Sequence, residues 1–310
     1  MNYKLSRTQI SRTVQLGARA LADYCIANDI HYVVTGSSGG LDSAVMLGFA
    51  REACRLAKGK KFKLTSVGLI MPCESHPDAE RLGRKAIDKF GAKKIRINLS
   101  PALNLATEIG SDVNSQIIGI LNDTNGRKAI NEWNYSLKIA KGNIKARLRM
   151  MFGTYHVARM MKGMVLSTDN LSEFWMAFWT ICGDVGDFGI IQQMLKGLEL
   201  YDVARYLGVP AEIIAAKPDD GLGIDSGDEA QLGASYPVLD RIMIQLIQAG
   251  FDPDGPREQL NSLPKIEEDI PGSVVRKLAT RAINGAFKRH GTFILSREQL
   301  ELPVIEDIKL

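Results

Sequence analysis

A short segment near the N-terminus, SSGGLDS, combines hydroxyl groups, two adjacent glycines and one carboxylate. The glycines, Gly39 and Gly40, let the backbone come close to phosphate oxygens. The hydroxyl groups of Ser38 and Ser43 can donate hydrogen bonds to the same oxygens, and the carboxylate of Asp42 can hold a Mg²⁺ ion. These residues therefore predict a binding loop for a magnesium-bound polyphosphate.

The neighbouring sequence places this loop between a strand and a helix. The apolar run His31–Thr35 precedes the loop, and the segment Asp42–Leu56 that follows it is typical of a helix. In an open parallel sheet, ligands bind beyond the carboxyl ends of the strands, where a helix N-terminus presents free N–H groups. The loop matches neither the Walker A motif nor the GxGxxG motif. A plain flexible turn is the alternative, and the order of strand, loop and helix favours nucleotide binding.

Strand and helix patterns alternate along the chain and must position the loop. Further strands are predicted at Lys63–Met71, Lys94–Leu99 and Met164–Leu166. Helices are predicted at Arg7–Asp29, before the first strand, and at Pro77–Phe90, between the second and third. This alternation predicts an α/β fold that is doubly wound around a mostly parallel sheet, with helices on both faces.

The rest of the chain is predicted as helices and loops. The helical segments are Asn104–Leu121, Ile130–Met161 with an interruption near Gly142, Leu195–Leu207, Asp228–Gly250 and Gly272–His290. The segment Lys217–Asp228 is too rich in Gly and Asp to be regular, which is typical of a lid or a loop that contacts a ligand. We expect residues 1–250 to form one nucleotide-binding domain, and residues 251–310 to form a C-terminal helical extension packed on the same domain.

Composition and charge indicate a folded globular protein. Apolar residues make up 45% of the 310 residues, charged residues make up 24%, and the formal net charge is +4. Basic and acidic residues are interspersed, so we expect no nucleic-acid partner. The first residues lack the apolar stretch of a secretory signal, and no run of about 18 apolar residues occurs. We therefore expect a cytoplasmic protein that does not bind a membrane.

Cysteines and tryptophans have no spacing that suggests a ligand site. The four cysteines form no CxxC pair, so we predict reduced, buried thiols at Cys25, Cys54, Cys73 and Cys182. The tryptophans are expected to pack in the core or at an interface rather than to stack on a ligand ring; they are Trp133, Trp175 and Trp179.

Three segments of the chain resemble one enzyme family. SSGGLDS matches the SGGxDS loop of the N-type ATP pyrophosphatases, which include NAD synthetases, GMP synthetases and argininosuccinate synthetases. Residues 142–150, GNIKARLRM, resemble the GNxxARxRM signature of NAD synthetases, and residues 167–173, STDNLSE, resemble their GTxNxSE segment. The similarity spans roughly residues 32–240, with further matches at Gly183-Asp184, residues 204–210 and residues 232–236.

This resemblance to ammonia-dependent NAD synthetases implies an adenine nucleotide alpha hydrolase-like fold and a homodimer with substrate sites near the subunit interface. It implies ATP-dependent amidation of deamido-NAD by ammonia through an acyl adenylate, with Mg²⁺ as the metal and with release of AMP and pyrophosphate. Longer members of the family carry an N-terminal glutaminase domain. The chain starts directly with the helix before the first strand, so we expect free ammonia, or ammonia delivered by a separate protein, as the nitrogen donor.

The resemblance also implies roles for individual residues. The phosphate loop described above would hold the phosphates of ATP, and Asp42 with Glu173 would ligate Mg²⁺ and so take part in catalysis. Thr168 would contact ATP, and Arg147 would bind deamido-NAD. Without the family pattern, a solvated acid at a helix terminus would be the favoured interpretation of Glu173, and a charge on the exposed face of a helix that of Arg147; the family pattern reverses this preference.

The chain departs from the family pattern in the half of the site expected to bind deamido-NAD. Ile181 stands where the family has a substrate-contacting Lys, and Phe188 stands where it has an Asp, with Asp187 one position earlier. Lys288 matches a family Lys, although its usual His neighbour is Phe287. We expect Asp187 and Lys288 to contact the substrate.

Two further departures concern the half of the site expected to bind ATP. Gly197 aligns with a phosphate-contacting Lys of the family, and Lys196 lies one position early, so a small shift would let Lys196 contact ATP. Asp219 stands where Ser or Thr is expected, and it would repel phosphate unless a metal or Lys217 intervenes. These changes leave two alternatives open: a divergent member that adenylates and amidates a different carboxylate, or a non-catalytic nucleotide-binding paralogue.

Overall fold

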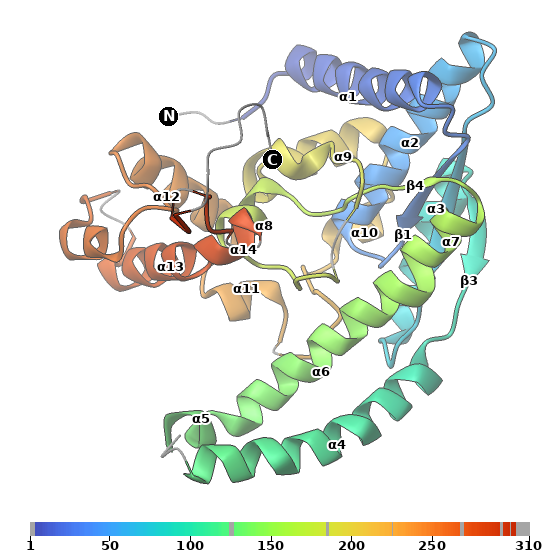
Figure 1. The fold of residues 1–310 in the computed structure, drawn as a ribbon. Coiled ribbons are helices and arrows are strands. Elements are labelled where there is room, and N and C mark those ends of the chain that lie inside the picture. Colours follow the sequence, from blue (N-terminus) through green and yellow to red (C-terminus); the bar gives the residue numbers. More distant parts are fainter. Residues whose placement is uncertain are drawn as a thin grey trace.

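The computed structural model describes residues 4–123, 127–183, 186–224, 226–266, 270–291, 294–297 and 299–301. Within these residues, four parallel strands form one sheet in the order β3-β2-β1-β4 (Figure 1). The strands are β1 Tyr32–Gly36, β2 Thr65–Ile70, β3 Lys93–Arg96 and β4 Met164–Val165. The predicted parallel sheet is confirmed, although β3 ends three residues before its predicted end.

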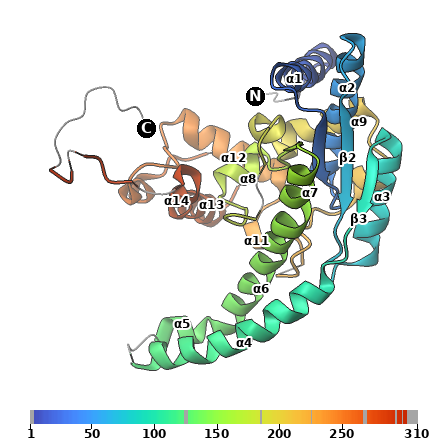
Figure 2. The same ribbon diagram turned by 45° about the vertical axis from the view of Figure 1, so that its right-hand side comes forward.

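Helices cover both faces of the sheet. Neighbouring residues of a strand point to opposite faces, so two adjacent residues of β1 show which helices lie on each side. Val33 belongs to the main hydrophobic core, together with side chains of α1 (Arg7–Ala27) and α2 (Leu41–Gly59). Val34 belongs to a different cluster that includes side chains of α7 (Tyr155–Met160). The main core is completed by α3 Pro77–Phe90, α9 Tyr201–Leu207 and α10 Ala211–Ala215. The doubly wound arrangement predicted from the sequence is therefore confirmed (Figure 2).

A pair of long helices extends away from the sheet. α4 (Ser100–Asp123) and α6 (Trp133–Arg149) run side by side and are connected through the short α5 (Arg127–Asn131) (Figures 1 and 2). Leu103 is the only buried residue of α4. Large apolar side chains of α4 are exposed, among them Leu105, Ile109 and Ile120 at 59%, 58% and 61%. The protein therefore presents an apolar helix surface that its own chain does not cover within the described residues.

The interruption predicted near Gly142 is wrong. Gly142 lies inside α6, where the missing side chain lets Leu222 and Ile224 come close: an added Cβ would lie 3.0 and 3.1 Å from their side chains. The helix instead changes at a π-helical turn, Met150–Thr154, which leads into α7. The glycine thus serves a close packing contact and does not break the helix.

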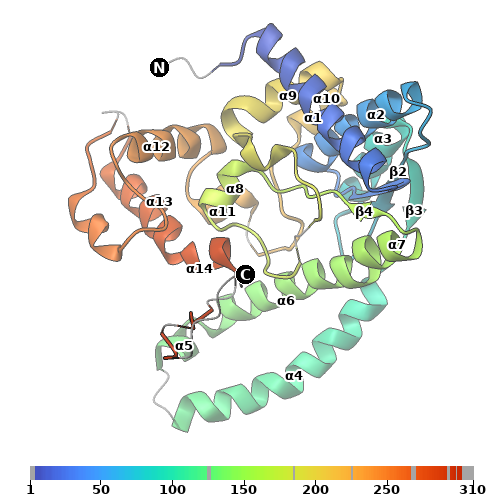
Figure 3. The same cartoon turned by 45° about the horizontal axis from the view of Figure 1, so that its top comes forward.

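A second hydrophobic core lies apart from the sheet, between α12 (Tyr236–Gln248) and α13 (Gly272–Asn284) (Figure 3). It includes Met176, and it contains side chains from both sides of residue 250, such as Leu246 and Phe251. The domain boundary predicted at residue 250 stays a prediction. The short helices of this region are α8 Leu171–Trp175, α11 Asp228–Leu232 and α14 Ala286–His290, with a 3₁₀ turn at Arg257–Ser262. Another 3₁₀ turn, Ile191–Gln193, contributes Ile191 to the main core.

The helix predicted from Asp228 to Gly250 is two helices in the structure. They separate after Gly233, whose φ of +85° is a conformation that favours glycine. The described residues between 217 and 227 form an irregular loop, as predicted. No helix in the described part of the chain is long and apolar enough to cross a membrane.

Candidate active site

The predicted phosphate loop connects the carboxyl end of β1 to the N-terminus of α2. Gly39 has a φ of +90°, and a Cβ at this position would collide with the carbonyl group of Ala79 in α3, so glycine is required. The hydroxyl oxygens of Ser38 and Ser43 lie 3.2 Å apart, and the N–H of Gly40 donates to Ser38 Oγ over 3.2 Å. The loop is a tight turn that presents hydroxyl groups at the N-terminus of a long helix.

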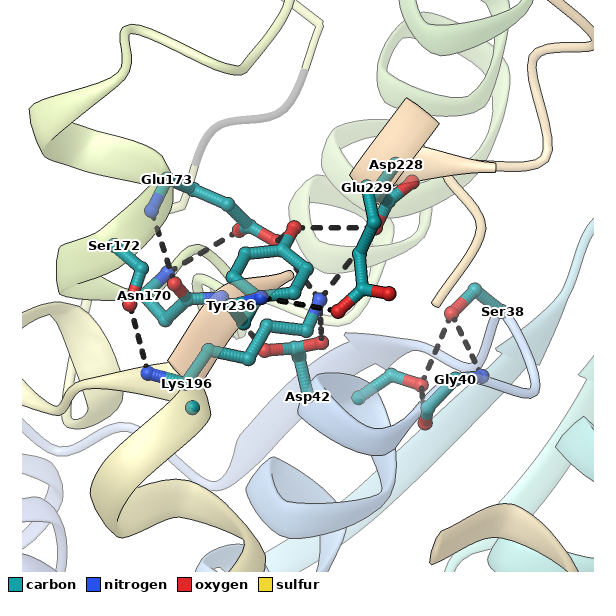
Figure 4. Close-up of polar contacts among 12 residues, drawn as sticks. Ser38, Gly40, Asp42, Asn170, Ser172, Glu173, Lys196, Asp228, Glu229 and Tyr236 are labelled. Atoms are coloured by element: carbon teal, nitrogen blue, oxygen red, sulfur yellow. Dashed lines mark hydrogen bonds and ion pairs between the residues drawn. The ribbon is translucent and has the colours of Figure 1, made fainter. Parts of the chain in front are cut away.

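Lys196 forms the centre of a buried ionic cluster (Figure 4). Its Nζ lies 3.0 Å from Asp42 Oδ2, 3.0 Å from Glu173 Oε1 and 3.6 Å from Asp228 Oδ2. The same ammonium group lies 4.4 Å from the centroid of the Tyr236 ring. The Tyr236 hydroxyl oxygen is in turn 3.2 Å from Glu173 Oε1 and 3.2 Å from Asp228 Oδ2. Three carboxyl groups therefore surround one cation whose residue is only 4% exposed.

Asn170 links the two acids predicted as metal ligands. It precedes α8, where the N–H of Glu173 donates to Asn170 Oδ1 over 3.0 Å and the N–H of Asn170 donates back to Glu173 Oε2 over 3.4 Å. Its Nδ2 donates to Asp42 Oδ1 over 2.8 Å. The sequence analysis gave Asn170 no role, although the spacing of Asn170 and Glu173 is the signature of a capping box.

The backbone of Lys196 is fixed by two buried residues whose roles the sequence analysis also missed. The N–H of Lys196 donates to Ser172 Oγ over 2.9 Å, and Ser172 Oγ donates to Asp240 Oδ1 over 2.5 Å. The N–H of Gly197 donates to Asp240 Oδ2 over 2.8 Å. No local sequence signal identifies Asp240, because it comes from α12, more than 40 residues after the lysine.

A π-helical turn, Lys196–Leu200, begins at this lysine and leads into α9. A π-helical turn bonds residue i to residue i+5, so it contains one residue more than an α-helical turn. The lysine side chain reaches the predicted site although the alignment places it one residue early.

Burial and charge act in opposite directions on the titration of this cluster. Burial raises the pKa of Glu173 to about 7, although the Lys196 ammonium acts to lower it. Burial also raises the pKa of Asp228 to about 6. Burial alone would lower the pKa of Lys196, but Asp42 and Glu173 outweigh it and hold that pKa well above its usual value. Lys196 is therefore charged at neutral pH. The acidic side chains around it favour the binding of an additional positive charge in the cluster.

The donor set of Asp42 and Glu173 fits a Mg²⁺ ion. Carboxylate oxygens are the hard ligands that Mg²⁺ prefers. One oxygen of each residue already lies 3.0 Å from a common cation, the Lys196 ammonium group. Two carboxylates that converge on one positive charge are a suitable pair of protein ligands for a divalent ion.

A cleft of about 430 Å³ joins the phosphate loop to the ionic cluster. Every residue predicted to bind ATP or Mg²⁺ lines it; they are Ser38, Gly39, Gly40, Asp42, Ser43, Thr168, Glu173 and Lys196. This volume lies in the range of small-molecule and cofactor sites. The structure thus brings together residues that are separated by more than 150 positions in the sequence.

The residues predicted to bind deamido-NAD do not line the described part of this cleft. Arg147 Nε donates to the carbonyl oxygen of Ile181 over 3.2 Å. Lys288 Nζ donates to the carbonyl oxygens of Ala177 and Trp179 over 3.0 and 2.6 Å. Arg147 and Lys288 therefore contact the same segment, residues 177–181, from two sides.

Asp187, the third predicted substrate residue, has structural partners on both carboxylate oxygens. Tyr155 donates its hydroxyl hydrogen to Oδ1 over 3.1 Å, and the N–H of Val165 donates to Oδ2 over 2.9 Å. Phe188, which replaces a family Asp, packs against Tyr24 with tilted rings whose centroids are 5.3 Å apart, and it forms a bridge with Leu166. Asp184 of the matched Gly-Asp pair lies outside the described residues.

Two other positions at which the chain departs from the family pattern are exposed. Ile181 is 42% exposed. Asp219 is exposed and lines the cleft, and its carboxylate comes within 4.8 Å of carboxylate oxygens of Asp220 and Asp228. Lys217 Nζ donates to the carbonyl oxygen of residue 226 over 2.5 Å, so this lysine binds its own loop and does not neutralise Asp219 directly.

The predictions for the cysteines need one correction. Cys25 and Cys73 are buried and Cys54 is half-buried, but Cys182 is exposed. Two of the tryptophans have the expected packing contacts. Trp175 packs against the second core, and Trp179 stacks on Phe174 with ring centroids 5.8 Å apart.

Comparison with known proteins identifies the family. The family model for NAD synthase matches residues 14–291. The NH3-dependent NAD+ synthetase of Syntrophomonas wolfei is 32% identical over 243 residues, which cover 78% of this chain and 83% of that protein. The enzyme of the same name from Pyrococcus furiosus is 31% identical over 251 residues, which cover 81% and 85%.

Solved structures share the fold. The NMN synthetase from Francisella tularensis superposes with a TM-score of 0.65 at 22% identity and covers 93% of this chain and 98% of its own. The NH3-dependent NAD synthetase from Campylobacter jejuni superposes with a TM-score of 0.64 at 20% identity and covers 93% and 99%. Together with the sequence relatives and the site geometry, these matches show that the chain belongs to the NAD synthase family.

Proposed function

We propose that this protein catalyses the ATP-dependent amidation of deamido-NAD by ammonia. The observation that carries the proposal is the single cleft in which the SSGGLDS loop meets Asp42, Glu173 and Lys196. Curated relatives that share about 30% of their residues with this chain are named NH3-dependent NAD+ synthetases. The cleft supplies what the ATP half of that reaction needs.

The reaction has two steps. A carboxylate is a poor electrophile, so an oxygen of the nicotinate carboxylate attacks the α-phosphorus of ATP. The bond to the bridging oxygen breaks, and pyrophosphate leaves with the electron pair. Ammonia then attacks the carbonyl carbon of the acyl adenylate, the bond to the AMP oxygen breaks, and the nitrogen loses one proton to become the amide.

Both steps place negative charge on oxygens, which fixed donors and cations stabilise. The phosphate loop would hold the phosphates through Ser38, Gly39, Gly40 and Ser43, with Thr168 beside them. Mg²⁺, held by Asp42 and Glu173, would supply positive charge to the phosphate oxygens. Lys196 would add a second positive charge at the same end of the cleft.

The second substrate is proposed to lie beyond Phe178, which lines the cleft. Phe178 belongs to the segment that Arg147 and Lys288 contact. We propose that the dinucleotide extends from the α-phosphate toward these two cations, because their charge suits its phosphates. Asp187 is proposed to act indirectly, because both of its carboxylate oxygens accept hydrogen bonds from other residues of the protein.

We further propose a homodimer in which a second copy covers the apolar surface of α4. Leu105, Ile109 and Ile120 form part of that surface. Exposed apolar patches of this kind mark interaction sites. A second copy of the chain presents the same surface, so two copies can cover each other in an isologous contact. The expected cytoplasmic location stays a prediction.

The decisive experiment incubates the purified protein with ATP, MgCl₂, NH₄Cl and deamido-NAD, and separates the products by chromatography. We expect NAD, AMP and pyrophosphate in equal amounts. A parallel reaction contains nicotinic acid mononucleotide as a smaller carboxylate substrate. AMP formed only with that substrate would identify a different acceptor, and the absence of AMP from both reactions would contradict an enzymatic role. Glutamine without free ammonia should not support turnover.

A further inference from the structure

The ammonium group of Lys196 lies where the proposed metal ligands converge. It is 3.0 Å from Asp42 Oδ2 and 3.0 Å from Glu173 Oε1 (Figure 4). Two positive charges cannot occupy one position, because at such short distances their repulsion exceeds what two carboxylates compensate. A divalent ion bound at this point between the two carboxylates would therefore displace the ammonium group from its present contacts with them.

The lysine also has partners other than these two acids. Asp228 Oδ2 lies 3.6 Å from the ammonium, and the face of the Tyr236 ring lies 4.4 Å from it. Both residues are buried, at 3% and 1% exposure, and both belong to helices outside the sheet core. Figure 4 shows Asp228, Tyr236 and Asp42 around the ammonium group of Lys196.

The lysine backbone is fixed, so only its ammonium end can move. Its N–H is bonded to Ser172 Oγ, and the next N–H is bonded to Asp240. The contact to Asp228 is longer than the other two ion pairs by 0.6 Å, so it can shorten when they are lost. A small rotation of the side chain is then enough to move the charge from one set of acids to the other.

We propose that Asp228 and Tyr236 are positioning residues that retain the Lys196 ammonium group when Asp42 and Glu173 bind Mg²⁺ with ATP. The inference rests on the proposed function in one respect, namely that the cleft binds Mg²⁺ together with ATP. Without Asp228, the displaced ammonium is a buried charge with no carboxylate partner, which is costly. The Tyr236 ring adds a cation–π contact that a buried, desolvated ammonium group needs. Loss of either residue therefore weakens metal binding.

The test measures Mn²⁺ affinity in the presence of ATP and without deamido-NAD, by electron paramagnetic resonance of free Mn²⁺. We expect Asp228→Asn to weaken Mn²⁺ binding about tenfold, a typical coupling between neighbouring sites. Asp220→Asn removes a carboxylate from the same loop that does not contact Lys196, and it serves as the charge-matched control. An equal loss in both variants, or no loss in Asp228→Asn, would overturn the proposal.

A double-mutant cycle separates an effect through the lysine from a general charge effect. In the Lys196→Met background, no ammonium needs a partner, so adding Asp228→Asn should change the Mn²⁺ affinity by less than about twofold. A tenfold loss that persists in this background would overturn the proposal. Thermal melts establish that each variant is folded before its affinity is used.

Tyr236 gives an independent test if Asp228→Asn does not fold. Tyr236→Phe keeps the ring over the ammonium and loses only the hydroxyl contacts to Glu173 and Asp228, so it should bind Mn²⁺ more tightly than Tyr236→Leu, which should lose about tenfold. Equal affinity in the two variants would overturn the role of the ring. If the double-mutant cycle gives the expected Mn²⁺ affinities but the wild-type protein makes no NAD, this inference stands and the proposed reaction is contradicted. Absence of any Mn²⁺–ATP binding by the wild type would contradict both.

Discussion

The side-chain amide of Asn170 donates a 2.8 Å hydrogen bond to Oδ1 of Asp42. Asn170 is also the N-cap of the helix that carries Glu173. One residue thus fixes the distance between two acids that follow the carboxyl ends of the neighbouring strands β1 and β4, 131 positions apart in the sequence. The geometry of the proposed metal pair depends on this link.

Replacing Asn170 by Ala should therefore damage stability and activity together. Loss of an N-cap costs about 1 kcal/mol in the free energy of unfolding. Loss of the bond to Asp42 should also weaken Mn²⁺–ATP binding and lower the rate of NAD formation. Ser6→Ala is a matched control, because Ser6 forms the same capping box on α1, far from the cleft. The prediction fails if both variants lose stability but neither loses Mn²⁺ affinity.

Asp42→Ala should abolish pyrophosphate release. The variant loses a proposed Mg²⁺ ligand and one of the two closest partners of Lys196. We expect a loss of turnover of about a hundredfold or more, since the metal supplies several kcal/mol of charge stabilisation. Pyrophosphate release is measured with saturating ATP and Mg²⁺. Asp23→Asn, which removes a surface partner of Lys60, is the control. Activity of Asp42→Ala equal to that of the wild type would remove Asp42 from the site.

Asp240 should make stability depend on pH. Burial raises its pKa from the ordinary value of 3.8 to about 6 in the folded protein. The folded state therefore binds the proton more tightly, so the stabilising contribution is complete below about pH 4 and is lost as the pH rises through 6. The difference in unfolding free energy between the wild type and Asp240→Asn should fall across this range and level off above pH 7.

Urea denaturation at several pH values measures this difference. Asp23 is a control for an exposed carboxyl group, because its side chain is 48% exposed. The difference between the wild type and Asp23→Asn should vary much less with pH. If the difference in unfolding free energy between the wild type and Asp240→Asn does not change with pH, the buried carboxyl group titrates as it does in the unfolded chain, and the prediction is wrong.

The ATP half of the site could be predicted from the sequence because its signals are local. The SSGGLDS loop is contiguous, and it lies between a strand and a helix that their apolar patterns identify. Glu173 lies in the segment DNLSE, whose Asn and Glu spacing forms a capping box in the structure. Local patterns of this kind survive in the fold because the same residues both form the element and line the cleft.

The residues that surround Lys196 could not be predicted in this way. Asp228, Tyr236 and Asp240 reach the site from α11 and α12, and only tertiary packing brings these helices to the sheet. The π-helical turn at Lys196 changes the register by one residue, and neither composition nor periodicity signals it. Gly142 was misjudged because glycine suits both a helix break and a close packing contact, and the sequence does not reveal that a loop approaches there.

Cys182 should be the only cysteine that reacts rapidly with a thiol reagent in the native protein. It is exposed, whereas burial raises the pKa of Cys25 to about 12 and that of Cys54 to about 11. At pH 8 those two thiols are protonated and therefore unreactive. Labelling with a chromogenic disulfide should give one fast thiol per chain, and Cys182→Ala should remove it. Two or more fast thiols in native protein would contradict the burial described here.

The same cysteine reports on the second substrate. Cys182 follows Ile181, whose carbonyl oxygen accepts the hydrogen bond from Arg147. Deamido-NAD bound near Arg147 should slow the labelling of Cys182, while ATP alone should have little effect. Arg147→Ala should remove the protection by deamido-NAD. Protection that is unchanged in this variant would show that deamido-NAD binds elsewhere.

The α4 surface should determine the oligomeric state. Ile109→Arg places a charge on an exposed apolar position at 58% exposure, and its burial between two copies would be unfavourable. Sedimentation velocity should show a dimer for the wild type and a monomer for this variant. Glu108→Lys is the control, since it introduces a similar charge at a polar position of the same helix. A dimer that persists in Ile109→Arg would place the interface elsewhere, and a monomeric wild type would contradict the homodimer.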